Sequence, residues 1–212
     1  MSRLTATQVD RFKPALFLLG LLPLVRWIWL GWQDELTANP MEFLTRSSGT
    51  WALVCLMVTL LVSPCREWFN QPALIRSRRL FGLFAFFYAA LHALAWAWWD
   101  QGFGLDAMWR DILDRPFITV GASAFLILLA LALTSNGRAM KSLGKRWKWL
   151  HRFIYLAAPL VILHYWWHKE GKNDFQEVTI YAILMALLLS WRLVGSRVMA
   201  RFRPETKKVS AS

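Results

Sequence analysis

Six long apolar runs divide this chain of 212 residues, and no other feature of the sequence limits its fold as strongly. An apolar helix of roughly 18–20 residues spans the hydrocarbon layer of a bilayer. The first run is too long for a cleaved signal peptide, so we expect it to span as well. The second is the weakest because it opens with Ser47, Ser48 and Gly49. The sequence predicts an all-α protein, a six-helix transmembrane bundle with helices at about 14–32, 47–64, 80–99, 117–134, 149–167 and 178–194.

The composition supports a membrane protein rather than a soluble one. Hydrophobic residues make up 57% of the chain and charged residues 18%, against about 45–50% and about 25% in an average soluble domain. Fourteen Trp and fourteen Phe also exclude a disordered chain, which could not keep so many large apolar side chains in water. Every connection between the predicted helices is short. We therefore expect a single transmembrane domain over residues 1–212.

Basic residues are distributed unevenly between the two sides of the predicted bundle. Eighteen lie before the first helix, after the second and fourth, and from the end of the sixth onward, whereas only five lie in the other three connections. Because cytoplasmic connections of membrane proteins carry the excess of Lys and Arg, we expect both termini in the cytoplasm. The basic residues that give the net charge of +12 alternate along the chain with long apolar runs. This distribution favours anionic lipid as a partner over nucleic acid.

Three residues in or beside the predicted spans, two cysteines and one arginine, have simple structural explanations. Cys55 and Cys65 are ten positions apart on one helix, which separates them by about 15 Å and excludes a disulfide bond between them. We interpret both as packing thiols. Arg26 lies in the first helix, and we expect its long side chain to reach the interface; a contact with a quinone or a haem propionate is the alternative.

The histidines carry the strongest functional signal. His92 lies 12 residues into the third predicted helix, roughly 18 Å from its cytoplasmic start, and His164 lies about 20 Å along the fifth. Two imidazoles at one level on different helices can supply both axial ligands of a haem iron. The alternative is that each ring only hydrogen-bonds a backbone carbonyl or a hydroxyl of a neighbouring helix. We interpret His168, at the outer interface, as a solvated loop residue.

A second ligand pair near the cytoplasmic side is less complete. His151 lies near the start of the fifth predicted helix, and Arg78 occupies the matching level on the third. Arginine stays protonated, so it is a poor iron ligand but a good partner for haem propionates. On a straight helix His151 and His164 point about 140° apart, unless Pro159 changes the phase of the helix. We expect one haem and leave a second open.

Two segments resemble a known family. They are QPALIRSRRLFGLFAFFYAALH (71–92) and LGKRWKWLHRFIYLAAPLVILHYWW (143–167). With the opening RLTATQVDRFK, they resemble the haem-binding membrane subunits of the bacterial periplasmic protein-methionine-sulfoxide reductase system, the MsrQ (YedZ) family. That family belongs to the wider ferric-reductase-like transmembrane group. The resemblance extends over nearly the whole chain.

The resemblance implies a b-type haem protein of the bacterial inner membrane. Such a protein takes electrons from the quinone pool and passes them to a periplasmic molybdopterin subunit, which reduces oxidised methionines in envelope proteins. The haem-ligating histidines of the family correspond to His92, His151 and His164, and some members are associated with FMN. Larger relatives carry two histidines on the third helix, where this chain has Arg78 in place of one.

Besides an electron-transfer subunit with no substrate-reducing site of its own, two other functions remain open at this point. The second reading is a reductase that acts directly on ferric iron or another outer acceptor. The third is a non-redox membrane protein, such as a transporter, whose histidines are structural. Haem absorbance in the purified protein separates the third reading from the first two.

Overall fold

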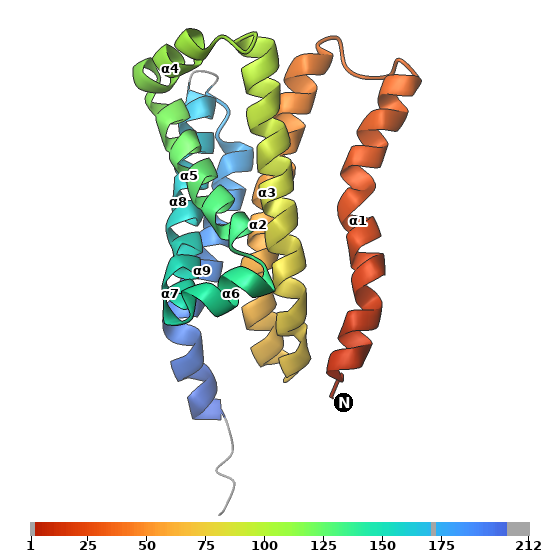
Figure 1. The fold of residues 1–212 in the computed structure, drawn as a ribbon, viewed down its shortest axis with the longest axis vertical. Coiled ribbons are helices and arrows are strands. Elements are labelled where there is room, and N and C mark those ends of the chain that lie inside the picture. Colours follow the sequence, from red (N-terminus) through yellow and green to blue (C-terminus); the bar gives the residue numbers. More distant parts are fainter. Residues whose placement is uncertain (1–2, 171–172, 203–212) are drawn as a thin grey trace, which may run out of the picture.

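The computed structural model describes residues 3–170 and 173–202, with side chains as far as Gly195, and all regular structure in these residues is helical (Figure 1). The all-α prediction is confirmed. The long helices are α1 (Ala6–Trp32), α2 (Pro40–Trp68), α3 (Arg78–Ala95), α5 (Pro116–Leu133), α8 (Ile154–Glu170) and α9 (Gln176–Phe202). The short elements are η1 (Pro72–Ser77), η2 (Trp96–Asp100), α4 (Leu105–Asp114), α6 (Gly137–Leu143), α7 (Lys145–Leu150) and η3 (His151–Phe153).

Five segments in the described residues are long and apolar enough to cross a bilayer, so the chain is a multi-pass membrane protein. The fifth predicted helix, 149–167, is not one of them because the chain divides there into α7, a 3-10 turn and the 17-residue α8. A count of six spans therefore stays a prediction. The five segments are Ala6–Trp32, Pro40–Trp68, Pro72–Asp100, Pro116–Leu133 and Gln176–Gly195.

Helix α2 is longer than the apolar run that predicted it. It begins at Pro40, whose missing N–H is not needed in a first helical turn, and the Asn39 side chain accepts a hydrogen bond of 3.2 Å from the Glu42 backbone N–H. The polar stretch at the start of the predicted run therefore lies inside the helix. There the Ser48 hydroxyl donates to the Leu44 carbonyl at 2.7 Å, which satisfies its buried polar group.

The core lies where α2 and α3 pack together and where α5 and α8 pack together. Tyr88 and Leu53 are fully buried large side chains of the first pair. In the second, Ala157 and Ala158 of α8 are completely covered. Small residues at such positions let helix backbones approach closely, which is the main source of packing between membrane helices.

Helix α1 stands at the edge of the bundle beside α3 (Figure 1). The buried Tyr88 hydroxyl donates to the Gly20 carbonyl at 2.6 Å, and Trp27 Nε1 donates to the Ser47 hydroxyl at 3.1 Å. The Phe84 ring lies directly against Gly20, where a Cβ atom would be 2.4 Å from Cε2 of the ring. The absence of a side chain at Gly20 therefore lets the Phe84 ring pack against α1.

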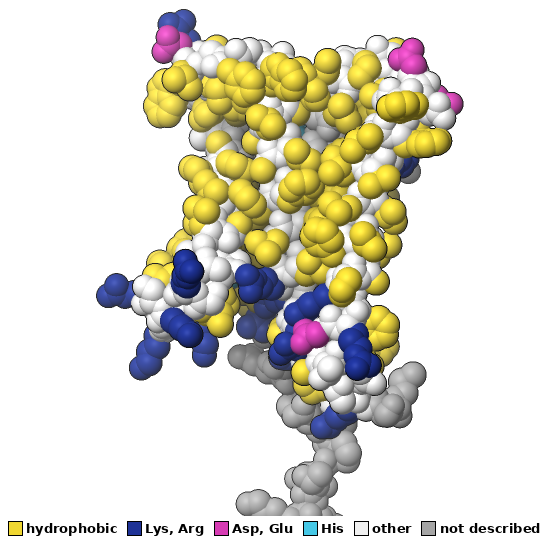
Figure 2. Space-filling view, turned by 45° about the vertical axis from the view of Figure 1, so that its right-hand side comes forward, with side chains coloured by type: hydrophobic (Ala, Val, Ile, Leu, Met, Phe, Trp, Pro, Cys, Tyr) yellow, Lys and Arg dark blue, Asp and Glu magenta, His cyan; other side chains and the backbone are white. Residues whose placement is uncertain are grey.

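Charged side chains separate to the two ends of the molecule, with a broad apolar belt between them (Figure 2). We call one the basic end; it holds the start of α1, the α2–α3 connection and α6–α7, with Arg11, Lys13, Arg76, Arg79, Arg138, Lys141, Arg146 and Lys148. We call the other the acidic end; its connections hold Asp34, Glu35, Asp100, Asp106, Asp114 and Glu170. The predicted basic residues beyond Gly195 lie outside the described side chains.

The close approach at Gly20 generates a stability prediction. Gly20→Ala places a methyl group against the buried Phe84 ring, and overpacking of this kind costs about 1–3 kcal/mol. We expect a lower thermal midpoint in detergent, measured by the loss of monodisperse protein on heating. Gly31→Ala is the matched control, because its Cβ would meet only Leu36 at an ordinary 3.5 Å. Equal midpoints for both variants would contradict this account of α1 packing.

Candidate functional site

The structure brings the side chains of His92 and His164 together inside the bundle. His92 lies on α3 and His164 on α8, and the centroids of their rings are 6.0 Å apart with ring planes at 78°. Both side chains are half-buried. The two residues do lie at the same level, as their distances along the predicted helices required.

A backbone carbonyl holds each of these rings in place. Nδ1 of His92 lies 2.8 Å from the Thr45 carbonyl oxygen on α2, and Nδ1 of His164 lies 2.7 Å from that of Phe117 on α5. Because a carbonyl oxygen can only accept, Nδ1 is the protonated nitrogen in both rings. The lone pair of each neutral imidazole is therefore on Nε2, which is the arrangement of a metal-ligating histidine oriented by a second hydrogen bond.

Two glycines make room for the histidine rings. A Cβ on Gly49 of α2 would lie 3.1 Å from His92 Nδ1, and one on Gly121 of α5 would lie 2.7 Å from His164 Nδ1. A side chain at either position would push the ring away from the carbonyl that orients it. The sequence interpretation assigned no role to Gly121, and it treated Gly49 only as a weakness of the second run.

The two halves of this site repeat each other. Thr45, Gly49 and His92 correspond to Phe117, Gly121 and His164, each 72 positions later in the chain. The side chains around these positions differ between the two halves, so the repeat is not evident in the sequence. The signal that was missed is the equal Gly-to-His spacing in both halves.

The geometry fits a haem iron between the two rings. Two metal–nitrogen bonds of about 2 Å each, with each ring centre about one ångström further back, place ring centres about 6 Å apart. The observed separation is 6.0 Å. Among the described residues, no group of three or more His, Cys, Asp or Glu side chains could hold a metal ion. Two facing imidazoles suit a haem, since the macrocycle supplies the remaining four ligands.

His151 and Arg78 are arranged differently from this pair. The His151 ring stacks on Trp147 with centroids 4.0 Å apart, and its Nε2 lies 3.2 Å from the Thr134 hydroxyl. Arg78 donates to the Tyr155 hydroxyl at 3.4 Å. In His151, Nε2 is therefore the nitrogen engaged with the protein, whereas in the central pair it is Nδ1. The 3-10 turn η3 holds His151 just before α8, and Pro159 lies inside that helix.

Other residues singled out in the sequence have structural positions. His168 is not a loop residue but a half-buried part of α8, with its ring 5.9 Å from that of Phe117. Its position four residues after His164, one turn further along the helix, explains why it lies beside the same aromatic ring. Arg26 is exposed on the apolar helix α1. Cys55 and Cys65 are both unbonded, as expected.

Sequence comparisons identify relatives over almost the whole chain. Residues 48–163 match the family described as the ferric reductase like transmembrane component. The protein-methionine-sulfoxide reductase heme-binding subunit MsrQ of Bordetella pertussis (strain Tohama I) is 58% identical over 192 residues, covering 91% of this chain and 93% of that protein. MsrQ of Ralstonia nicotianae is 51% identical, covering 91% and 89%, and that of Xanthomonas campestris pv. campestris is 42% identical, covering 81% and 82%. No solved structure matches the chain.

The glycine contacts generate a graded prediction for cofactor retention. Gly121→Ala brings a methyl group within 2.7 Å of His164 Nδ1, so we expect a loss of more than half of the bound haem, measured as pyridine haemochrome per protein. Gly49→Ala approaches His92 less closely, at 3.1 Å, and should lose less. Gly137→Ala, with nothing within 4 Å of its Cβ, is the control. Equal haem content in all three would show that the glycines do not seat the rings.

Proposed function

Because this chain belongs to the ferric-reductase-like transmembrane family, and within it to the MsrQ group of heme-binding subunits, we propose that it carries electrons through the membrane on b-type haem. It receives them from a membrane quinol and delivers them to a periplasmic molybdopterin subunit that reduces methionine sulfoxide in envelope proteins. The observation that carries the proposal is the facing pair His92 and His164, each oriented through Nδ1.

The proposed topology has six spans in the bacterial inner membrane, with residues 1–212 forming one transmembrane domain. Helix α8 is the sixth span, since its 17 residues reach about 26 Å, close to the thickness of the hydrocarbon layer. The basic end faces the cytoplasm together with both termini, and its cations contact anionic lipid. The segregation of charge in Figure 2 supports this orientation.

The residues of the chain prepare the site for one-electron transfer. A bound haem would supply an iron that gains and loses a single electron. The Thr45 and Phe117 carbonyls keep Nδ1 protonated and make Nε2 a stronger donor, because a hydrogen bond at one ring nitrogen raises the basicity of the other. The apolar helices around the pair exclude water and lower the local dielectric, which are the means by which a protein sets a haem potential.

The residues near the basic end have a separate proposed role. Arg78 would pair with haem propionates, and His151 is the histidine we would expect to ligate a second haem. We propose one haem between His92 and His164 and keep the second as a prediction. FMN also stays a prediction from the family resemblance; the cations of the basic end would suit its phosphate.

Direct reduction of an outer acceptor is the second candidate function, favoured by the match to the ferric reductase like family. The two are separated by mixing the reduced protein with ferric citrate or with the periplasmic reductase subunit and its sulfoxide substrate. We expect fast haem reoxidation only in the second mixture, with one methionine sulfoxide reduced per two electrons. Reoxidation by ferric citrate at the same rate would favour direct reduction.

The ligand assignment is tested by replacing each histidine. His92→Ala and His164→Ala each remove one of two axial ligands, so we expect each variant to lose most of its haem in a pyridine haemochrome assay. His168→Ala is the control, since its ring packs on Phe117 and faces no second imidazole at ligating distance among the described contacts. Native haem content in either of the first two variants would refute the assignment.

A further inference from the structure

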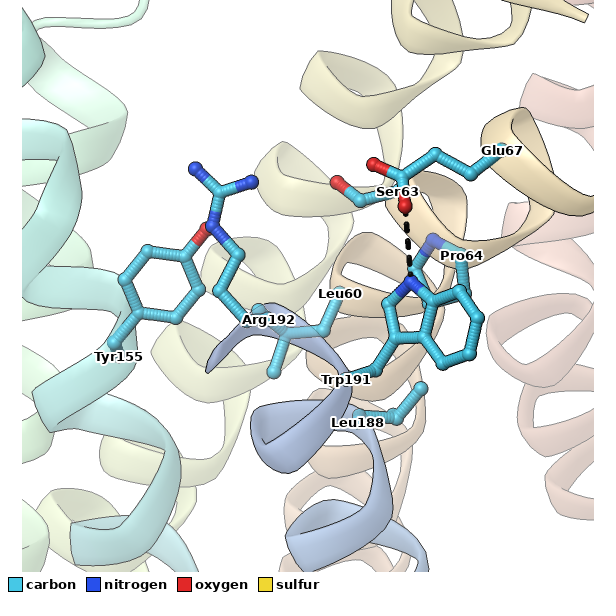
Figure 3. A pocket seen from close by; sticks show the side chains of 8 residues that line it. All are labelled: Leu60, Ser63, Pro64, Glu67, Tyr155, Leu188, Trp191 and Arg192. Atoms are coloured by element: carbon cyan, nitrogen blue, oxygen red, sulfur yellow. Dashed lines mark hydrogen bonds between the residues drawn. The ribbon is translucent and has the colours of Figure 1, made fainter. Parts of the chain in front are cut away.

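A pocket of about 300 Å³ lies between α2, α8 and α9, toward the basic end and away from the histidine pair (Figure 3). Its polar and aromatic walls come from three helices that are far apart in the chain. The residues that define it are Ser63 and Glu67 of α2, Tyr155 of α8, and Leu188, Trp191 and Arg192 of α9. No motif in the sequence connects these positions with one another.

One wall of the pocket is a hydrogen-bond acceptor. The Glu67 side chain is only 21% exposed, and its carboxylate accepts 3.2 Å hydrogen bonds from Trp191 Nε1 and from the Arg66 guanidinium. Figure 3 shows this carboxylate beside Ser63, with the Trp191 indole below it. A carboxylate has about four acceptor positions, so it can accept further hydrogen bonds from a ligand.

The opposite wall is a donor. The Arg192 guanidinium lies over the Tyr155 ring, 5.6 Å from its centroid, and no carboxylate of the described residues pairs with it. In Figure 3 Tyr155 and Trp191 stand on either side of the pocket. A flat ring would therefore have aromatic neighbours on its sides, an acceptor near one edge and a cationic donor near another.

We propose that this pocket binds the ring of a membrane hydroquinone and that Glu67 accepts the proton of one ring hydroxyl. The inference rests on the proposed electron-transfer function, and it adds where the hydroquinone binds and which residues bind it. A hydroquinone has two hydroxyls that donate to a carboxylate, and after oxidation it has two carbonyl oxygens that accept from Arg192. An anionic lipid headgroup fits less well, because its phosphate would approach the negative charge of Glu67.

Oxidation of the hydroquinone is balanced if the haem of the proposed function is the oxidant. Oxidation of one hydroquinone breaks two O–H bonds, turns two C–O single bonds into C=O bonds and releases two protons and two electrons. A haem held by His92 and His164 would accept these electrons one at a time, and would pass the first electron on to the periplasmic subunit before it accepts the second. The proton of the hydroxyl at Glu67 passes to the carboxylate and then to water at the basic end, and the proton of the other hydroxyl is released to water there.

The position of the pocket connects it to the residues already described. Tyr155, in its wall, accepts a hydrogen bond from Arg78. It lies nine residues before His164 on the same helix, a rise of about 14 Å. A ring bound beside Tyr155 would thus lie about 14 Å along α8 from the level of the proposed haem, toward the basic end.

The first test removes the proton acceptor and keeps its shape. In phosphatidylcholine nanodiscs, we expect short-chain ubiquinol to reduce the haem of Glu67→Gln at least tenfold more slowly than the haem of the unaltered protein. Dithionite reduction, haem content and the reduced spectrum should be unchanged, which a structural defect would alter. Glu170→Gln, at the acidic end, is the control. A rate for Glu67→Gln equal to that of the unaltered protein would overturn the role of Glu67.

The second test fills the pocket and needs no haem. Leu188→Trp should abolish saturable binding of a tritiated short-chain quinone, whereas Leu187→Trp should not, since Leu187 is 61% exposed on the same helix. Unchanged binding in Leu188→Trp overturns the pocket assignment, even if the unaltered protein contains haem. Quinone binding that is lost when phosphatidylglycerol is added would instead identify a lipid headgroup site. Absence of haem from the unaltered protein would refute the proposed function, whereas the quinone-binding result would still decide whether the pocket binds a quinone.

Discussion

The hydrogen bond from each Nδ1–H to a backbone carbonyl is the interaction on which the candidate site depends. Without it, an imidazole on a membrane helix can rotate and expose either nitrogen, and a buried N–H without an acceptor is costly. The carbonyls of Thr45 and Phe117 remove both problems at once. They can do so only because α2 approaches α3 and α5 approaches α8 closely, which the glycines at 49 and 121 permit. The close packing of these helices therefore also orients the two histidine ligands.

The repeat of this unit explains why the two rings meet. Helices α2 and α5 run from the acidic end to the basic end, and α3 and α8 run back (Figure 1). Two copies of one helix pair, placed side by side, bring equivalent histidines to one level. The similarity fades toward the basic end, where His151 has no facing histidine and a polar pocket lies between α2, α8 and α9. The acidic-end half is built for a symmetrical ligand pair, and the other half has the varied polar groups that a proton-releasing substrate requires.

Sequence reasoning located the histidine pair and failed at positions governed by local irregularity. The common level of His92 and His164 follows from a constant rise of 1.5 Å per residue and needs no tertiary information. His151 lies in a 3-10 turn before α8, and apolar periodicity does not reveal such a turn. For the same reason, α7, the turn and α8 were predicted as one span, and α4 and α6 were not predicted. His168 was misplaced because the predicted helix ended at residue 167, three residues before the observed end of α8 at Glu170.

The sequence by itself determined that this chain is an all-helical membrane protein with one basic side, and that two histidines share one depth. These properties depend on residue type and on distance along a helix. Only the tertiary structure decided which carbonyl orients each ring, why Gly49 and Gly121 lack side chains, and that Glu67 and Arg192 face one pocket. The physical reason is that helices which are apolar on all sides carry no periodic signal for their rotation. Their mutual orientation is set by close packing and hydrogen bonds between residues far apart in the chain.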